Sequence, residues 1–398
     1  EYISSDVADQ WWRELFAQQD WQLDTPRILQ NKNNQGVMLS QEYQQVGLKS
    51  LKLRPLTIII PQVDKSGSEV GLDDGQPTLP EEVWLVNAEE GAVIHFKEAL
   101  DLRNGRLPSV ERGELSGNIT ITRVNLRPDA QAVPWSLQTR DLFIERGRVF
   151  TNDRVTIRWA DSIITGRDLR IEMKGDLFNP GGNQTNSPWG PLDKMDLYTL
   201  EQIDVGLPTG GLWASMKLPL AAPFAHLASA PARLQVNSQG RFSFDFRDST
   251  ASLTNGVQIV HLLGDKLRDT FNCQQLNVAI NPPSKDSPPP SQTASTRLGD
   301  FEILTLEATG IDQLEEFVGE KKVELKAPSI DAFASAKRLD IDFLQKRIEF
   351  DGKLNIPTAT QSIAWLKYAG YEFRSPRIDY EADSRPASQT SRHLGYLI

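Results

Sequence analysis

Short runs in which apolar and polar residues alternate recur along this chain, and their spacing limits the folds it can adopt. Seven have the form apolar-x-apolar: ITIT (119–122), LFIE (142–145), VTIR (155–158), LRIE (169–172), FSFD (242–245), VQIV (257–260) and LNVA (276–279). The starts at 142, 155 and 169, and those at 242, 257 and 276, lie 13 to 19 residues apart. This spacing allows a strand of about 5–8 residues plus a turn, whereas a parallel neighbour requires a crossover of about a dozen residues or more. The pattern therefore predicts antiparallel strands.

The segments between these runs carry residues that favour turns. Gly, Asn and Asp recur in ERGR (145–148), TNDR (151–154), SQGR (238–241) and LTNG (253–256). These residue types dominate tight turns because they tolerate left-handed backbone conformations. We therefore expect each segment to connect two neighbouring strands in an all-β protein of twisted antiparallel sheets.

The N-terminal residues follow a helical period instead. Ser5 is a favourable helix N-cap, and Trp11, Trp12, Leu15 and Phe16 recur at helical spacing. We predict one short helix at about residues 6–18, with its apolar stripe packed on the protein rather than on a partner. From LKSLKLRPLTIII (48–60) onward the period is two.

Polar stretches rich in proline and glycine suggest how the chain is divided. The stretch NPPSKDSPPPSQTASTR (281–297) has no apolar face to bury and is typical of a linker or loop. We expect five segments: an N-terminal helical or extended segment (1–47), a first β-jellyroll module (48–178), a second (192–280), a linker or loop (281–300), and a third, weaker β module with an interrupted end (301–398).

The amino-acid composition limits the kinds of molecule that this protein is expected to bind. The 398 residues carry a net charge of −10 without any run rich in Lys and Arg, which argues against nucleic acid as a partner. No apolar stretch approaches the roughly 20 residues of a membrane helix. The single cysteine, Cys273, excludes an intrachain disulfide and is expected to be an ordinary buried residue. The chain begins at Glu1 without Met, which suggests a trimmed or processed product.

The usual motifs of enzyme sites are absent from the sequence. There is no G-x-G loop, no phosphate loop and no G-x-S-x-G elbow. The four histidines, His95, His226, His261 and His393, are too far apart for a metal-binding motif, and His261 is expected to be a structural or solvated strand-end residue. We therefore expect no metal, no cofactor and no catalytic residue.

Two strand pairs share a finer pattern. In residues 232–280, Asn255-Gly256-Val257-Gln258-Ile259 precedes a polar turn and then the segment FNCQQLNV (271–278), and Gly117-Asn118-Ile119-Thr120-Ile121 repeats the first part. These segments resemble the OstA-like modules of the lipopolysaccharide transport proteins LptA, LptC and the periplasmic part of LptD. That family has Gly-Asn-Val-x-Val and then Leu-x-Cys/Ala-x-x-Leu-x-Val, so Gly and Asn are exchanged at 255–256. The chain is longer than LptA or LptC and resembles a multi-module relative.

The resemblance implies a twisted, V-shaped antiparallel jellyroll, the β-taco, in which two sheets hold lipid acyl chains. It implies a non-enzymatic periplasmic protein that carries a lipopolysaccharide-like glycolipid. Its partners would be other lipopolysaccharide transport proteins, joined by edge-to-edge β-strand pairing. An N-terminal segment absent from this chain would anchor it to the inner membrane.

Alternation identifies the residues that would line such a groove, because successive strand residues face opposite sides. The candidates for lipid contact are Ile119, Ile121, Ile157, Trp159, Leu169, Ile171, Phe242, Phe244, Phe246, Val257, Ile259, Leu276, Val278 and Ile280. The same residues would form the core of any closed β-sandwich, so the sequence leaves both interpretations open.

Two rival functions belong to other classes. One is a structural or adhesive all-β module of the cell envelope with a closed core and no ligand. The other is a carbohydrate-active enzyme on a β-scaffold such as a parallel β-helix, which the short repeat length disfavours. Between the first rival and the lipid carrier, the resemblance favours the carrier.

Overall fold

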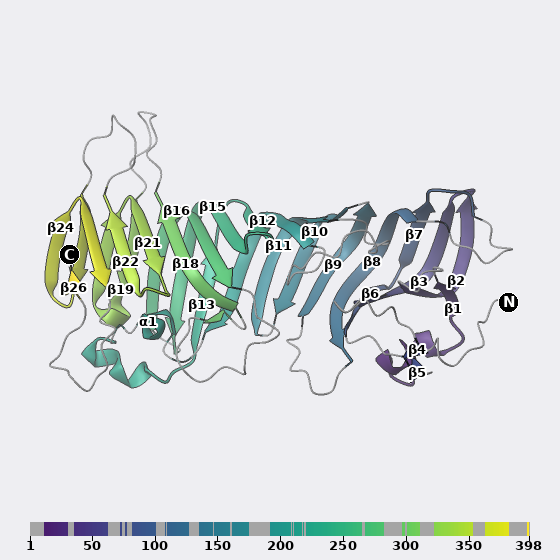
Figure 1. The fold of residues 1–398 in the computed structure, drawn as a ribbon, viewed down its shortest axis with the longest axis horizontal. Helices are drawn as coiled ribbons and strands as arrows, with labels where there is room; N and C mark the ends of the chain where they lie inside the picture. Colours follow the sequence, from purple (N-terminus) through teal and green to yellow (C-terminus); the bar gives the residue numbers. More distant parts are fainter. Residues whose placement is uncertain are drawn as a thin grey trace, which may run out of the picture. The chain divides into compact units, whose positions relative to one another are not determined.

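The computed structural model has the all-β, antiparallel architecture that the sequence predicts (Figure 1). It describes residues 12–30, 36–62, 72–73, 76–77, 82–100, 108, 110–126, 135–145, 147–159, 161–174, 192–207, 209, 211–216, 218, 220–264, 267–281, 297–298, 301–310, 322–352, 363–381 and 396–397. The chain divides into two compact units: unit 1 contains Glu1–Ala160 and Arg167–Met195, and unit 2 contains Asp161–Gly166 and Asp196–Ile398.

Unit 1 is built from long antiparallel strands. They are β1 (Arg27–Gln30), β2 (Val37–Gly47), β3 (Ser50–Gln62), β6 (Glu82–Ala88), β7 (Gly91–Phe96), β8 (Val110–Asn125), β9 (Trp135–Glu145), β10 (Arg148–Trp159) and most of β11 (Ser162–Met173). The two-residue strands β4 (Leu72–Asp73) and β5 (Gln76–Pro77) form a hairpin of their own.

The long strands of unit 1 each belong to two arms of the sheet. The first half of β8 pairs with β7 and the second half pairs with β6, and β3 divides its pairing between the same two strands. We call these sides the β6 arm and the β7 arm. The β6 arm contains 37–40, 56–62, 82–88, 119–125, 135–139 and 156–159, and the β7 arm contains 42–47, 50–53, 91–96, 110–116, 142–145 and 148–150.

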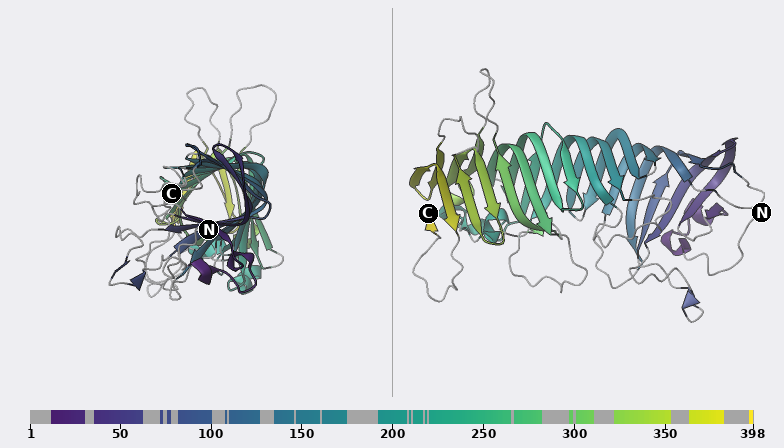
Figure 2. Two further views of the ribbon diagram at one scale, coloured as in Figure 1. Left: turned by 90° about the vertical axis from the view of Figure 1, so that its right-hand side faces the viewer. Right: turned by 45° about the horizontal axis from the view of Figure 1, so that its top comes forward.

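Unit 2 repeats this plan with shorter strands toward the C-terminus (Figure 2). Its elements are most of β12 (Leu192–Leu207), α1 (Gly211–Ser215), the 3-10 helix η5 (Ala222–Leu227), β13 (Ala232–Asn237), β14 (Phe242–Asp245), β15 (Thr250–Leu263), β16 (Leu267–Asn281), β17 (Arg297–Leu298), β18 (Phe301–Thr309), β19 (Val323–Ala327), the 3-10 helix η6 (Pro328–Ile330), β20 (Ala332–Ala336), β21 (Arg338–Asp342), β22 (Arg347–Asp351), β23 (Ala364–Tyr368), β24 (Tyr371–Ser375), β25 (Arg377–Glu381) and β26 (Tyr396–Leu397).

Strands β15 and β16 likewise divide their pairing between two arms. The β13 arm contains β13, residues 257–263 and 267–273, and β19, β20, β23 and β24. The β14 arm contains β14, residues 250–254 and 275–281, and β18, β21, β22, β25 and β26. Of the stretch 281–300, expected to be a linker or loop, only residues 281 and 297–298 are among the described residues.

A bend in the long strands separates the arms. Gly117 in β8 has φ of 83°, and Asn255 and Gly256 in β15 have φ of 70° and 71°. The register with the next strand shifts at both places. Residues with positive φ inside a strand produce a bulge and a sharper twist, so the strand bends here without reversing. Gly117 also donates its backbone N–H to Asp141 of the neighbouring strand, over 3.0 Å.

Three of the four turn predictions are therefore wrong. Residues 253–256 lie within β15 and 151–154 lie within β10, each at a shift of register. Their Gly, Asn and Asp residues serve the bends of long strands, which require the same backbone conformations as turns. Residues 238–241 join β13 to β14, which follow each other along the same side of β15 in one register and are not paired with each other, so this segment also marks a bend. Residues 145–148 connect the paired strands β9 and β10 as predicted, and all seven alternating runs lie in strands.

The core of unit 1 lies between its two arms. One cluster of buried residues joins Leu56 and Ile119 of the β6 arm to Leu53 and Ile94 of the β7 arm. A second cluster covers the opposite face of the β6 arm, where Trp12 packs with Leu39 and Ile59. At the end of unit 2 the rings of Tyr368 and Tyr380, from opposite arms, lie 6.3 Å apart.

The predicted N-terminal helix is wrong in the part that the structure describes. Residues 12–15 form a 3-10 turn, the chain then leaves helical geometry, and a second 3-10 turn, η2 (Trp21–Leu23), follows. Trp12, Leu15 and Phe16 of this segment pack onto the sheet. This packing requires apolar residues at suitable spacing, but it does not require a continuous helix. The packing of this stripe on the protein is as predicted, although Trp11 and residues 1–10 lie outside the described residues.

Candidate functional site

Apolar residues form rows that run across the strands on the inner face of each unit. Cross-strand partners share a face, so the register gives the rows directly. In unit 1 one row is Leu29, Met38, Ile58, Val86, Ile121, Leu137 and Ile157. In the β14 arm of unit 2 one row is Phe242, Leu253, Leu276, Ala308, Leu339, Phe350 and Ile378. Each row is a continuous apolar track across seven strands.

Four of the residues predicted from the sequence, Ile121, Ile157, Phe242 and Leu276, lie in these rows, and the other ten lie elsewhere in the two units. Those that the structure buries are Ile119, Ile157, Leu169, Phe242, Phe244, Phe246, Val257, Ile259, Leu276 and Ile280, and those left half-buried are Ile121, Trp159, Ile171 and Val278. Ile119, Ile121, Ile157, Trp159, Leu169 and Ile171 belong to unit 1 and the other eight to unit 2. Within unit 2 the register brings Phe242 beside Leu276 through Leu253, and it places Val257 opposite Cys273.

Aromatic residues gather where the inner face of the β6 arm reaches its strand ends. Trp84 and Trp135 flank Arg123 in the pairing, and their rings meet edge to face at 4.7 Å. Arg123 forms a two-pronged ion pair with Glu82. The sequence analysis missed this group, although the even spacing of Trp84 from Val86 and of Trp135 from Leu137 could have placed both tryptophans on the inner face.

A buried polar cluster interrupts the apolar inner face of the β13 arm. The Asp269 carboxylate accepts hydrogen bonds from the Trp213 indole Nε1 at 2.7 Å, the His261 Nδ1 at 2.9 Å, and the Ser329 Oγ and backbone N–H at 2.6 and 3.0 Å. All four residues are at least nine-tenths buried. His261, expected to be a structural or solvated strand-end residue, lies buried within β15. Asp269 was not predicted, although its polar side chain at an inward position of β16 was a signal in the sequence.

The hydrogen bonds of this cluster favour the ionised form of Asp269. Burial alone raises the pKa of Asp269, but the hydrogen bonds from His261, Ser329 and Trp213 outweigh it and hold the pKa below the usual 3.8. The His261 Nδ1 lies 2.9 Å from this carboxylate, which accepts hydrogen bonds when ionised, and among the described residues the buried His261 Nε2 has no hydrogen-bond partner. A serine–histidine–aspartate catalytic triad requires the serine hydroxyl to bond to histidine. Here Ser329 bonds to Asp269 instead, so the cluster is not arranged as such a triad.

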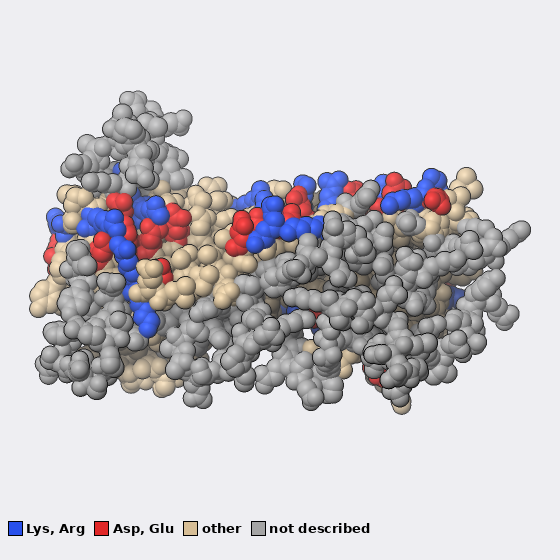
Figure 3. All heavy atoms as spheres, viewed as in Figure 1, with Lys and Arg blue, Asp and Glu red and all other residues tan. Residues whose placement is uncertain are grey.

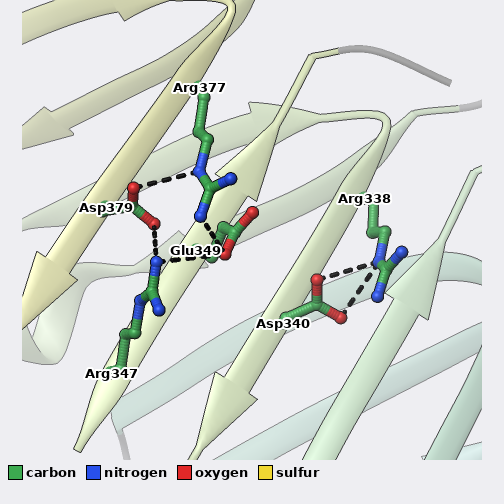
Figure 4. A network of polar contacts seen from close by, with 6 residues as sticks. All are labelled: Arg338, Asp340, Arg347, Glu349, Arg377 and Asp379. Carbon is green, nitrogen blue, oxygen red and sulfur yellow. Dashed lines mark hydrogen bonds and ion pairs between the residues drawn. The ribbon is translucent and has the colours of Figure 1, made fainter. Parts of the chain in front are cut away.

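The outer face of the β14 arm is strongly charged. The register aligns Glu307, Asp340, Glu349 and Asp379 in one row, and Arg338, Arg347 and Arg377 bridge them at 2.8 to 3.4 Å (Figure 4). Figure 3 shows Lys and Arg side chains (blue) intermingled with Asp and Glu side chains (red) at the C-terminal end of unit 2. The apolar and charged faces therefore lie on opposite sides of the same strands.

A hollow of about 500 Å³ opens on the β7 arm of unit 1. It is lined by Lys49, His95, Phe96, Glu111, Arg112, Glu145 and Arg148. His95 contacts Ser50 at 2.9 Å, and Arg148 pairs with Glu145 at 2.6 Å. Its charges of both signs make it unlike the apolar inner face, so it is no site for an acyl chain.

These features define the structural class of the protein. The protein is an all-β protein whose bent antiparallel strands form two arms in each unit, with apolar rows on the inner faces. In the described ranges, no cluster of three or more His, Cys, Asp or Glu residues could hold a metal ion, and no helix there is long and apolar enough to span a membrane. No protein-family model, curated protein or solved structure matches the chain.

Proposed function

We propose that this protein is a non-enzymatic, periplasmic lipid-binding bridge of the lipopolysaccharide transport type, carrying a glycolipid by its acyl chains along the inner faces of its sheets. The observation that carries the proposal is the continuity of the apolar rows, which cross seven strands in unit 1 and seven in the β14 arm. Motif copies at the strand bends, Gly117-Asn118 and Asn255-Gly256, support the likeness to OstA-like modules.

Rows of this kind suit an acyl chain energetically. Each methylene buried contributes about 0.8 kcal/mol, so a chain of about a dozen carbons gains on the order of 10 kcal/mol before the costs of ordering. No directional bond is required, because apolar contacts are nonspecific. A lipid could therefore move along the rows by exchanging one apolar neighbour for the next.

Strand β2 supports the proposed partners. Its residues 41–47 are exposed and pair with β3 on one side, and no described strand pairs with their other side. Tyr43 and Val46 are 49% and 50% exposed. An edge strand with unpaired backbone groups can receive another strand, so we propose edge-to-edge pairing with other lipopolysaccharide transport proteins at this edge.

One observation favours the closed structural or adhesive module instead. Ile119, Leu169 and Leu276 are only 1–2% exposed, and in unit 1 the inner faces of both arms share one packed cluster. In that function the arms cover each other and no ligand enters. The two functions differ in whether these arms separate.

A crosslinking experiment distinguishes them. A photoreactive residue at Phe244, Ile259 or Val278 faces inward and is expected to capture glycolipid, whereas Gln258, the neighbour of Ile259 on the opposite face, is not. Organic extracts of the detergent-free protein are analysed by mass spectrometry alongside. Crosslinking that is equal at Ile259 and Gln258, or extracts without lipid, would leave the closed module as the better account.

A further inference from the structure

The connection between β12 and β13 is far longer than the pairing of these strands requires. Leu207 pairs with Ala232, so the two strands are antiparallel neighbours, and such neighbours are commonly joined by about two to five residues. Here residues 208–231 make the connection and include α1 and η5 (Figure 1). We call the described residues 211–216, 218 and 220–230 of this connection the strap. Its extra length must serve another contact.

The strap covers part of the inner face of the β13 arm. Trp213, Met216 and Leu218 are buried, and Leu220, Phe224 and Leu227 pack against Ala232, Leu263 and Leu267. Leu263 alternates with the buried His261 and Ile259 along β15, which identifies this face as the inner one. The strap thus makes the same kind of apolar contact there that an acyl chain would make.

Hydrogen bonds tie the strap to the arm at one place. Trp213 donates to Asp269 at 2.7 Å, and Ser329, which also bonds to Asp269, accepts the Ala221 backbone N–H at 2.7 Å. The strap begins at Gly211, where φ is 64° and an added Cβ would lie 2.0 Å from the His261 Nε2. The strap therefore meets the arm through a buried polar latch of Trp213, His261, Asp269 and Ser329.

We propose that the strap is a displaceable cover, latched through Asp269, that occupies the inner face of the β13 arm in place of an acyl chain. This proposal rests on the proposed function, since it concerns access to the same apolar face. Apolar contacts between strap and arm can be exchanged for contacts with lipid, whereas the bonds to Asp269 cannot. The latch therefore sets how readily the face opens.

Hydrogen exchange tests the latch itself. Asp269→Asn keeps the side-chain volume but removes the charged acceptor, and it should speed exchange of the Leu218 and Ala221 amides about tenfold or more, while amides of β21 and β22 stay protected. Asp245→Asn is the matched control, because the asparagine oxygen still accepts the Arg247 N–H in that exposed turn. Trp213→Phe, which leaves the other bonds to Asp269 intact, replaces Asp269→Asn if that variant does not fold.

Titration with parinaric acid, a fluorescent long-chain fatty acid, tests the competition. The latch variant is expected to bind it several-fold more tightly than the unaltered protein. Unchanged exchange in the strap, or faster exchange while both proteins bind parinaric acid equally tightly, would overturn the displaceable cover. If neither protein binds parinaric acid although the strap exchanges faster, the lipid-carrying function fails while the latch stands as a structural tie; the two failures are thereby distinguished.

Discussion

Trp213 donates a 2.7 Å hydrogen bond from its indole N–H to the carboxylate of Asp269, a residue 56 positions further along the chain. The carboxylate is buried and ionised, and it accepts three further hydrogen bonds from His261 and Ser329. Groups of this kind are costly to leave unsatisfied. The connection between β12 and β13, which contains Trp213, is in this way tied to Asp269 within strand β16.

Asp269→Asn is expected to lower the free energy of unfolding by about 2–4 kcal/mol at neutral pH, because buried donors lose a charged acceptor. The folded-state pKa of Asp269 is lowered, so its stabilisation is present above the ordinary pKa of 3.8 and is lost as the pH falls through the folded pKa. Urea unfolding of both proteins between pH 7 and pH 3 measures this. A difference that grows on acidification would contradict the assignment.

The strand bends give a second prediction. Gly91 has φ of 93°, and a Cβ there would lie 2.0 Å from the Leu53 carbonyl oxygen, whereas Gly256 has φ of 71° and no atom closer than 3.9 Å. Gly256→Ala should therefore cost about 1–2 kcal/mol for the left-handed conformation alone, and Gly91→Ala clearly more. Thermal unfolding compares the two. Equal losses would show that the backbone near Leu53 yields without cost.

The inner rows give a third prediction. Leu276 is 2% exposed, and Leu276→Ala should lower the free energy of unfolding by about 2–5 kcal/mol, the usual cost of a buried leucine. The adjacent Gln275 faces solvent, so Gln275→Ala should change it by less than about 0.5 kcal/mol. Chemical denaturation of both variants is the measurement. Similar values for both would contradict the assigned faces.

The charged row on the β14 arm gives a fourth prediction. Glu349 and Asp379 are direct cross-strand partners bridged by Arg347 and Arg377. Removing both arginines leaves like charges opposite each other, so the double alanine variant should lose about 1 kcal/mol or more at low salt. At about 1 M salt the loss should shrink, because the Debye length falls to about 3 Å. Arg374→Ala, at an exposed pair with Glu372, is the control.

Alternation in the sequence predicted the strands well, because burial of one face imposes a period of two. All seven runs lie in strands, and all fourteen candidates from Ile119 to Ile280 are buried or half-buried. The pattern could not separate a bend from a reversal at Asn255-Gly256, because both use left-handed residues. Nor could it predict that Ser329 and Trp213 meet Asp269, since contacts between distant segments leave no local period.

The thiol of Cys273 gives the last prediction, which also bears on whether the inner face opens. Cys273 faces inward beside Val257 and is 3% exposed, and burial raises its pKa to about 12. Because only the thiolate reacts readily, iodoacetamide at pH 8 should label the folded protein slowly and the urea-unfolded protein at the rate of a free cysteine. Asp269→Asn should speed labelling of the folded protein if release of the strap exposes β16. Rapid labelling of the unaltered protein would instead mean that the β13 arm is already open in solution.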